Sequence, residues 1–265
     1  MDFACPAGGT NFRRLQMLKV QDFGKRNVVD ISAESIDSFD GTLIFTGDDN
    51  IVRIGPKCLS NENLRFELGS CSVIETEGQT ALDDMFVYGL RRAHLTIGSG
   101  SGFNGATRML MHEPGRIQIG RGALFAGQID VSISDMHSII DIETKERINP
   151  PANIVLGDRV WVGQRSMILK GAQVGEGSII GAMSAVSGQI PANSVSAGVP
   201  ARPLRSGVTW RFDLVPWPGH TESDQVDPST GAPYFQQARG LGRIARKTRS
   251  ALGRLERAGR VLRHG

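Results

Sequence analysis

Residues 156–191 read LGDRVWVGQRSMILKGAQVGEGSIIGAMSAVSGQIP, and an aliphatic residue returns at every sixth position of this stretch. The aliphatic residues are Leu156, Val162, Ile168, Val174, Ile180 and Val186. A second, mostly small set follows each of them by four positions: Val160, Ser166, Ala172, Ser178, Ser184 and Ile190. A period of six fits neither a helix nor an alternating antiparallel strand. It suits a coil with three short flat faces that places one aliphatic side chain on each face.

This repeat predicts an all-β fold, a left-handed parallel β-helix in which three hexads make one coil of about 18 residues. The aliphatic side chains then stack into columns inside a triangular prism, and the small residues fit where the section narrows. Glycine follows four of the aliphatic residues and supplies the backbone freedom that tight corners need. These are Gly157, Gly163, Gly175 and Gly181.

The repeat weakens on both sides of this stretch, which divides the chain. It is partial between Leu43 and Phe103, clean again at Ile119, Phe125 and Val131, and it stops at His137. Residues 138–152, SIIDIETKERINPPA, interrupt it and predict a projecting loop that forms one wall of an acceptor pocket. We expect an irregular N-terminal cap (1–40), the β-helix (41–205), an extended linker (206–238) and a C-terminal helical extension (239–265).

Charge is unevenly distributed along the 265 residues. The net charge is +3, but residues 239–265 contain nine Lys or Arg and one Glu, so the preceding body is acidic. A nucleic-acid-binding body is therefore not expected, because binding of phosphates needs positive charge on the folded surface. The tail reads as a basic amphipathic helix that could contact the inner face of a membrane. A helix packed on the protein and a disordered basic tail are the alternatives.

Location is predicted from what the chain lacks. It has three cysteines without metal-ligand spacing, no apolar leader in its first twenty residues, and no apolar window of about 18 residues. A cytoplasmic protein is expected.

His137 is the first candidate for chemistry, because it lies where a clean repeat ends at the projecting loop. An imidazole titrates near neutral pH, so it can accept a proton from a hydroxyl that attacks a thioester. Asp135 lies two residues earlier. In an extended strand both side chains would point to the same side, and the carboxylate could orient the ring.

A set of motifs then indicates a family. The chain carries DMHSI at 135–139, IN at 148–149, VLGDRVWVG at 155–163, ILKG at 168–171, AGVPAR at 197–202 and VTW at 208–210. In combination they resemble the hexapeptide-repeat acetyltransferases, in particular the sugar O-acetyltransferases of bacterial capsule and lipopolysaccharide synthesis. The resemblance covers about residues 117–210.

The resemblance implies an acetyl-CoA-dependent O-acetyltransferase that works as a homotrimer, with active sites in clefts between neighbouring prisms and a sugar or glycan acceptor. His137 matches the general base of the family, and Trp161 matches a tryptophan beside the reacting groups. Arg202 and Arg205 match basic positions near the nucleotide. The transfer would be direct, without a covalent enzyme intermediate.

The acyl donor suggests further contacts. A long pantetheine arm can lie along the coils where residues are small. The suitable residues are Gly181, Ala182, Ser184 and Gly188. No metal is predicted.

Four other functions are compatible with this architecture. They are an N-acetyltransferase of an amino sugar nucleotide, an acetyltransferase of serine or another small metabolite, a carbonic anhydrase with three histidines around zinc, and a trimeric scaffold without catalysis.

Overall fold

The computed structural model describes residues 18–213, 215 and 218–219. The predicted basic helix 239–265 and most of the predicted linker lie outside them, so both stay predictions. The chain divides into two compact units, residues 1–210 and residues 211–265, and the first unit holds every strand described below. Within the described residues, no helix is long and apolar enough to cross a membrane.

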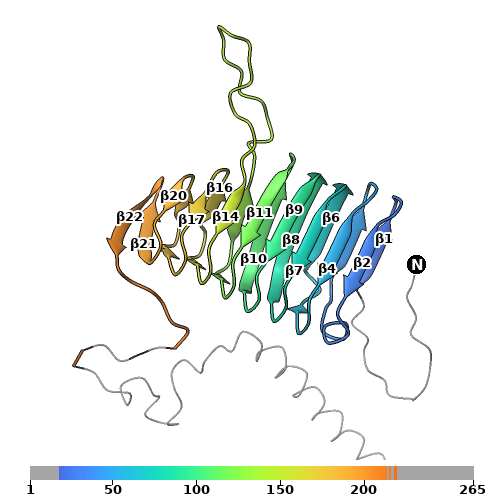
Figure 1. Ribbon diagram of the computed structural model, residues 1–265, viewed down its shortest axis with the longest axis horizontal. Helices are drawn as coiled ribbons and strands as arrows, with labels where there is room; N and C mark the ends of the chain where they lie inside the picture. The colour runs from blue at the N-terminus through green and yellow to red at the C-terminus, as the bar shows by residue number, and fades with distance from the viewer. Residues whose placement is uncertain (1–17, 214, 216–217, 220–265) are drawn as a thin grey trace, which may run out of the picture. The chain divides into compact units, whose positions relative to one another are not determined.

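The first unit is a three-sided prism of parallel strands (Figure 1). Face 1 consists of β1 (Lys19–Asp22), β3 (Thr42–Phe45), β6 (Arg65–Ser70), the later part of β8 (Ala81–Arg91), the later part of β10 (Gly102–Met111), β13 (Ile129–Ser132), β16 (Met167–Leu169) and β19 (Ala185–Val186). Face 2 consists of β2 (Val28–Ile31), β4 (Ile51–Ile54), β7 (Val73–Thr76), β9 (Ala93–Ile97), β11 (Gly115–Ile119), β14 (Ile154–Leu156), β17 (Gln173–Val174) and β20 (Gln189–Ile190).

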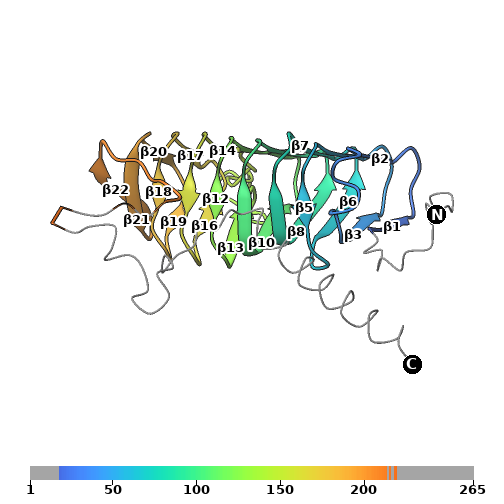
Figure 2. The ribbon, with the colours of Figure 1, turned by 90° about the horizontal axis from the view of Figure 1, so that it is seen from below.

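Face 3 completes each coil. It consists of β5 (Leu59–Ser60), the first parts of β8 and β10, β12 (Leu124–Phe125), β15 (Trp161–Val162), β18 (Ile179–Ile180) and β21 (Ser194–Gly198). β22 (Ala201–Ser206) pairs antiparallel with β21 and ends the stack. Figure 2 shows the neighbouring coils side by side along the prism. The predicted left-handed parallel β-helix is confirmed.

The core is a set of side-chain columns that run from coil to coil. All six aliphatic residues of the repeat and all six residues four positions later are buried. Val131, Ile168 and Val186 are direct partners on face 1, so they form one column. Close stacking also fixes the glycines: a Cβ on Gly175 would lie 2.4 Å from the amide nitrogen of Ala192. The inward pattern predicted from the sequence is confirmed.

The N-terminal half uses larger coils than the repeat region. On face 1 Leu43 pairs with Phe66, so one coil between them is several residues longer than the coil that joins Ile168 to Val186. The wider section is filled by buried phenylalanines, among them Phe103 and Phe125, whose ring centroids are 4.6 Å apart. Tight packing requires larger side chains in a wider section. The six-residue period is partial there because these coils are longer than three hexads.

The predicted N-terminal cap is wrong over its described part. β1 and β2 pair in register with β3 and β4, so residues 19–31 already form a coil. The sequence pattern does not reveal this coil, because strands of only four residues separated by a turn carry no clear six-residue period.

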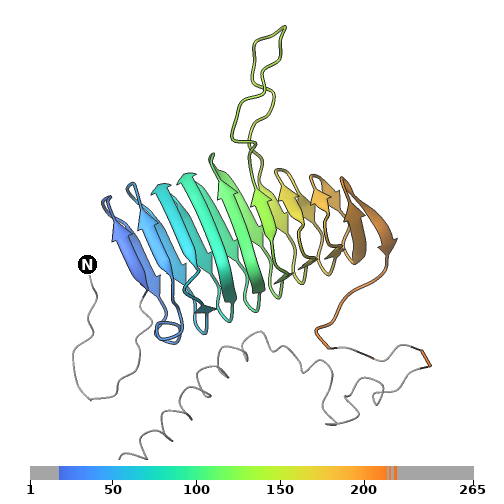
Figure 3. The same ribbon diagram turned by 180° about the vertical axis from the view of Figure 1, so that it is seen from behind.

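One coil is enlarged at the corner between faces 1 and 2. On face 1 Val131 still pairs directly with Ile168, although residues 138–152 leave the prism between β13 and β14. Figures 1 and 3 show this segment projecting from one edge of the prism. The projecting loop 138–152 therefore lies where the sequence placed it.

The stacked columns predict a large cost for an inward truncation. Ile168→Ala leaves a cavity in a fully packed column and should lower the free energy of unfolding by about 2 to 5 kcal/mol. The control is Met167→Ala, whose side chain points outward and is 41% exposed; it should cost much less. Urea denaturation at fixed protein concentration measures both. Equal losses would contradict the assignment of the two side chains.

Candidate active site

His137 lies on a tight turn at the base of the projecting loop. Its amide donates to the carbonyl of Asp135 at 2.7 Å, across Met136, whose φ is 66°. The strand has ended before this point, so Asp135 and His137 are not in extended backbone. The prediction that they share one side of a strand is therefore wrong. Among the described residues nothing forms a hydrogen bond with the His137 ring, and His137 is exposed.

Asp135 has other partners. Its Oδ2 accepts hydrogen bonds from Lys170 Nζ and from Asn149 Nδ2, the latter at 2.8 Å. The Lys170 ammonium, and then the Asn149 amide, lower the pKa of Asp135 below its ordinary value. No described contact joins this carboxylate to the imidazole. Asp135 thus stabilises the turn that carries His137, and the sequence-based prediction that it orients the ring is not supported.

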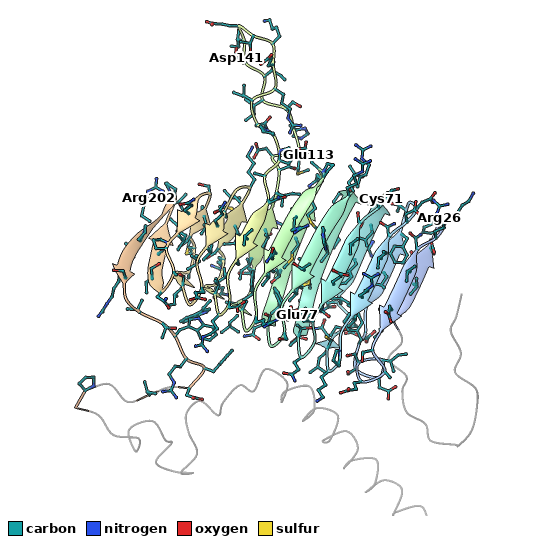
Figure 4. The ribbon with its side chains drawn as sticks, viewed as in Figure 1. Arg26, Cys71, Glu77, Glu113, Asp141 and Arg202 are labelled. Atoms are coloured by element: carbon teal, nitrogen blue, oxygen red, sulfur yellow. The ribbon has the colours of Figure 1, made fainter. Side chains whose placement is uncertain are left out.

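Asn149 and Arg147 were missed as site residues. Asn149 is 5% exposed, and its side chain bonds the Asp135 carboxylate, the His137 carbonyl and the Ile139 amide. Arg147 makes two parallel hydrogen bonds to Glu113, both 2.7 Å, and a third at 3.0 Å to the Asn149 carbonyl. Figure 4 labels Glu113 where the loop leaves the prism. Asn149 belongs to a motif that indicated the family, but Glu113 is distant from Arg147 in the sequence and no spacing rule joins them.

Trp161 lies on a different side of the prism. It is the first residue of β15 on face 3, and its side chain is 39% exposed. Its ring lies 6.0 Å from that of Trp210, and Trp210 is held to the corner by a 2.6 Å hydrogen bond from its indole N–H to the Arg159 carbonyl. The Trp161 ring thus lies beside the Trp210 ring and presents a partly exposed aromatic surface.

His137 and Trp161 do not meet within one chain. His137 belongs to the corner between faces 1 and 2, whereas Trp161 stands on face 3. Two hollows along the outer surface of face 2 contain neither residue: one is lined by residues that include Arg53 and Gln118, and the other by residues that include Gln189. Neither of these hollows is therefore a site that unites the two predicted residues.

The predicted donor-binding residues gather at two corners. Gly181 and Ala182 follow β18, and a Cβ on Gly181 would lie 2.9 Å from the Cβ of Ala197, which pairs with Arg202. Gly188 lies at the corner that carries the projecting loop, and a Cβ there would meet nothing within 4 Å. Arg202 and Arg205 are both exposed. These residues suit an extended anionic ligand, but the structure does not bring all of them together.

Ser184 differs from the other predicted donor-binding residues. It is 1% exposed, and its hydroxyl donates to the Gly181 carbonyl at 2.7 Å while it accepts from the Gly198 amide at 3.1 Å. Its side chain closes the corner from inside and does not line a ligand groove. The six-residue repeat predicts that Ser184 points inward, and the structure agrees. The prediction that Ser184 binds the acyl donor is therefore not supported.

The edge that carries the projecting loop is also basic. Arg91 and Arg92 lie at the end of β8, one coil before Glu113. The Arg116 amide donates to Asn153 Oδ1 at 2.8 Å. The Gly115 amide donates to the Arg92 carbonyl, so these arginines are close neighbours. All three are exposed, and within the described chain no acceptor contacts their guanidinium groups. Such a group suits a negatively charged ligand.

The other described histidines do not form a metal centre. His94 Nε2 lies 3.6 Å from Glu75 Oε2, and the His112 ring packs on Tyr88 with centroids 4.8 Å apart. Burial lowers the pKa of His112. In the described part of the chain, no three His, Cys, Asp or Glu side chains cluster as metal ligands.

Comparison with known proteins identifies the repeat. The family described as "Bacterial transferase hexapeptide (six repeats)" matches residues 153–188, which include β14 to β19. The chain is 35% identical over 97 residues to the putative lipopolysaccharide biosynthesis O-acetyl transferase WbbJ of Escherichia coli (strain K12). That match covers 34% of this chain and 50% of the relative, so the chain spans about half of that protein's length.

Two longer similarities agree with this match. The chain is 28% identical over 160 residues to the polysialic acid O-acetyltransferase of Neisseria meningitidis, covering 56% of this chain and 68% of the relative. The crystal structure of the polySia specific acetyltransferase NeuO superposes with a TM-score of 0.68 and 24% identity, over 80% of this chain and 95% of that one. The resemblance to the hexapeptide-repeat acetyltransferases is confirmed.

The carboxylates at the loop base predict how the turn responds to acid. The pKa of Asp135 is lowered from 3.8 and that of Glu113 from 4.5, the latter by Arg147. A carboxyl whose pKa is lower in the folded chain contributes stability above its unfolded pKa, and the contribution is lost as pH falls through the folded value. Hydrogen exchange of residues 134–152, corrected for the intrinsic rate, should therefore stay constant from pH 7 to about pH 5 and rise only in stronger acid.

The variant Lys170→Met tests whether the Asp135 carboxylate causes this response to acid. Without the ammonium the pKa of Asp135 returns towards its ordinary value, so the loop base should loosen at a higher pH than in the wild type. Loosening between pH 7 and pH 5 in the wild type would indicate a histidine and contradict the assignment to carboxylates.

Proposed function

We propose that this chain is an acyltransferase that moves an acetyl group from acetyl-CoA to a hydroxyl of a cell-surface polysaccharide or its glycan precursor. The observation that carries the proposal is the exposed imidazole of His137 on a fixed turn, directly beside the repeat that matches the bacterial transferases. The names of the similar proteins, which include sugar polymer O-acetyltransferases, support the reaction class.

His137 acts as general base in this proposal. Its free ring nitrogen accepts the proton of the acceptor hydroxyl while that oxygen forms a bond to the acetyl carbonyl carbon. Collapse of the tetrahedral intermediate breaks the carbon–sulfur bond, and the imidazolium returns the proton to the departing thiolate. Trp161 can hold the intermediate's oxyanion through its indole N–H or pack on the acceptor ring. The balance needs no further reactant.

The donor is proposed to follow the small-residue corners. Gly188 leaves an open surface beside Lys170 and the loop base, and Arg202 and Arg205 offer guanidinium groups for phosphates. No metal is needed for this reaction.

The basic edge favours a negatively charged acceptor. Arg91, Arg92 and Arg116 lie beside the loop base and can pair with carboxylates of a polymer that extends away from His137. One of the similar proteins is named for polysialic acid, a polymer of carboxylated sugars, which agrees with this charge.

The site is proposed to form between subunits of a homotrimer. His137 and Trp161 stand on different sides of one prism, and the projecting loop exposes four isoleucines that a neighbouring chain can cover. They are Ile139, Ile140, Ile142 and Ile148, with Ile142 83% exposed.

Replacing the base tests the reaction. His137→Ala should lower turnover by about 10² to 10⁴, because general-base assistance is lost, while the fold persists. Product formation from acetyl-CoA is measured with polysialic acid, a neutral sugar, an amino sugar nucleotide and serine as acceptors. The matched control is His94→Ala on face 2, which should retain activity. Wild-type turnover in the His137 variant would remove His137 from the mechanism, and products only with an amine would favour N-acetylation.

Subunit mixing tests the shared site. His137→Ala and Trp161→Ala should each be poorly active, but after unfolding and joint refolding some clefts pair an intact His137 with an intact Trp161 from different chains. Activity should return to a sizeable fraction of the wild type, and light scattering should report three chains per particle. No recovery in mixed particles would place both residues of one site in the same chain.

A further inference from the structure

Asn149 is the one buried residue of the projecting loop 138–152. A carboxamide can donate two hydrogen bonds and accept two, and all four are made here. Nδ2 donates to Asp135 Oδ2 and to the His137 carbonyl, both at 2.8 Å. Oδ1 accepts from the Ile139 amide at 2.7 Å and from Arg147 Nε at 3.1 Å.

Three of these partners are residues 135, 137 and 139, which surround the proposed base. The Asn149 side chain lies on the segment that returns to the prism. It therefore fixes the segment that leaves the prism on both sides of His137. A buried amide stays in place only when its polar atoms are paired, so the turn and the carboxamide stabilise each other.

The coils before and after the loop both hold the turn and the Asn149 carboxamide in place. Glu113, which follows β10, binds Arg147 through two hydrogen bonds, and Arg147 binds both the side chain and the carbonyl of Asn149. Lys170, which follows β16 on the next coil, binds Asp135. Hydrogen bonds thus run from the rigid prism through Asn149 to the His137 backbone.

The His137 turn needs such support. Met136 has a positive φ of 66°, which costs a residue with a side chain roughly 1 to 2 kcal/mol. Strained backbone persists only where its surroundings determine it. The His137 ring has no hydrogen-bond partner among the described residues, so the position of the imidazole depends on the backbone of the turn.

We propose that Asn149 is a positioning residue for His137. Its carboxamide keeps Met136 in the strained conformation and thereby aims the imidazole at the acceptor hydroxyl. The inference rests on the proposed function, in which His137 is the base. Asn149 does not contact substrate, because it is buried and its hydrogen-bonding capacity is used within the chain.

Kinetics of Asn149→Ala test this role. A misplacement of about 1 Å can cost 10²-fold, so kcat should fall about 10- to 100-fold while KM for acetyl-CoA and for the acceptor changes less than about twofold. The double variant His137→Ala/Asn149→Ala should be no slower than His137→Ala, because Asn149 acts through the imidazole. The control is Asn153→Ala, which removes a bond to the Arg116 amide on the same corner and should leave kcat near that of the wild type.

Hydrogen exchange gives a readout that does not depend on activity. The Ile139 amide donates to Asn149, so its exchange should accelerate in Asn149→Ala and stay unchanged in Asn153→Ala. An inactive wild type with this exchange pattern would defeat the proposed function and leave the structural role of Asn149 established. Faster exchange with an unchanged kcat would overturn the positioning role.

Two further outcomes are decisive. Additive losses in the double variant, or a KM for the acceptor that rises with kcat unchanged, would show that Asn149 acts separately from His137 and would overturn the proposal. If Asn149→Ala does not fold, Arg147→Lys replaces it, because a lysine cannot make the paired bonds to Glu113 and the bond to Asn149 Oδ1 together. It should give a smaller loss of kcat with the same absence of additivity.

Discussion

Parallel pairing between successive coils is the constraint on which this structure depends. Each strand bonds the equivalent strand of the next coil, so equivalent residues stack and every second side chain points inward. A residue that joins an inward column is committed to the core and is lost to ligand binding. Ser184 illustrates this, because its small polar side chain would suit a donor groove but its position in the column turns it inside. Function is therefore restricted to corners, outward positions and insertions.

The insertion after β13 combines freedom with rigidity. A loop that leaves a prism is not required to pair with the next coil, so it can turn within a few residues, as it does at Met136. The coils on either side continue in register, and they supply Glu113 and Lys170 at fixed places. Binding residues on loops held by a rigid scaffold are a general solution in proteins. Here the scaffold is connected to residue 137 through hydrogen bonds to the loop backbone.

The sequence predicted those parts of the molecule that repeat. The six-residue period of 156–191 determined the inward columns, the three faces and the position of the loop, because each depends only on local spacing. The first coil, residues 19–31, was missed because its two strands have only four residues each and it is longer than a coil of the repeat. The prediction for Asp135 and His137 was wrong because the strand ends at Ser132, before both residues, and a tight turn follows. The Glu113–Arg147 pair could not be foreseen, since its two residues meet only once the loop has returned to the prism.

In the proposed function, the separation of His137 from Trp161 makes the chemistry depend on assembly. Placing both beside one acceptor within a single prism would require either residue to cross a corner, which the register of β13, β15 and β16 forbids. A second copy removes this conflict, because the loop edge of one prism can face the Trp161 side of another. Burying a large apolar side chain contributes about 1.5 to 3 kcal/mol, so burial of the exposed loop isoleucines would favour the proposed contact. The same contact would exclude water from the cleft, and it would bring the aromatic surface to the base. Catalytic competence would then be a property of the assembled protein, with the hydrogen bonds at the loop base ensuring that the imidazole is already aimed when the partner arrives.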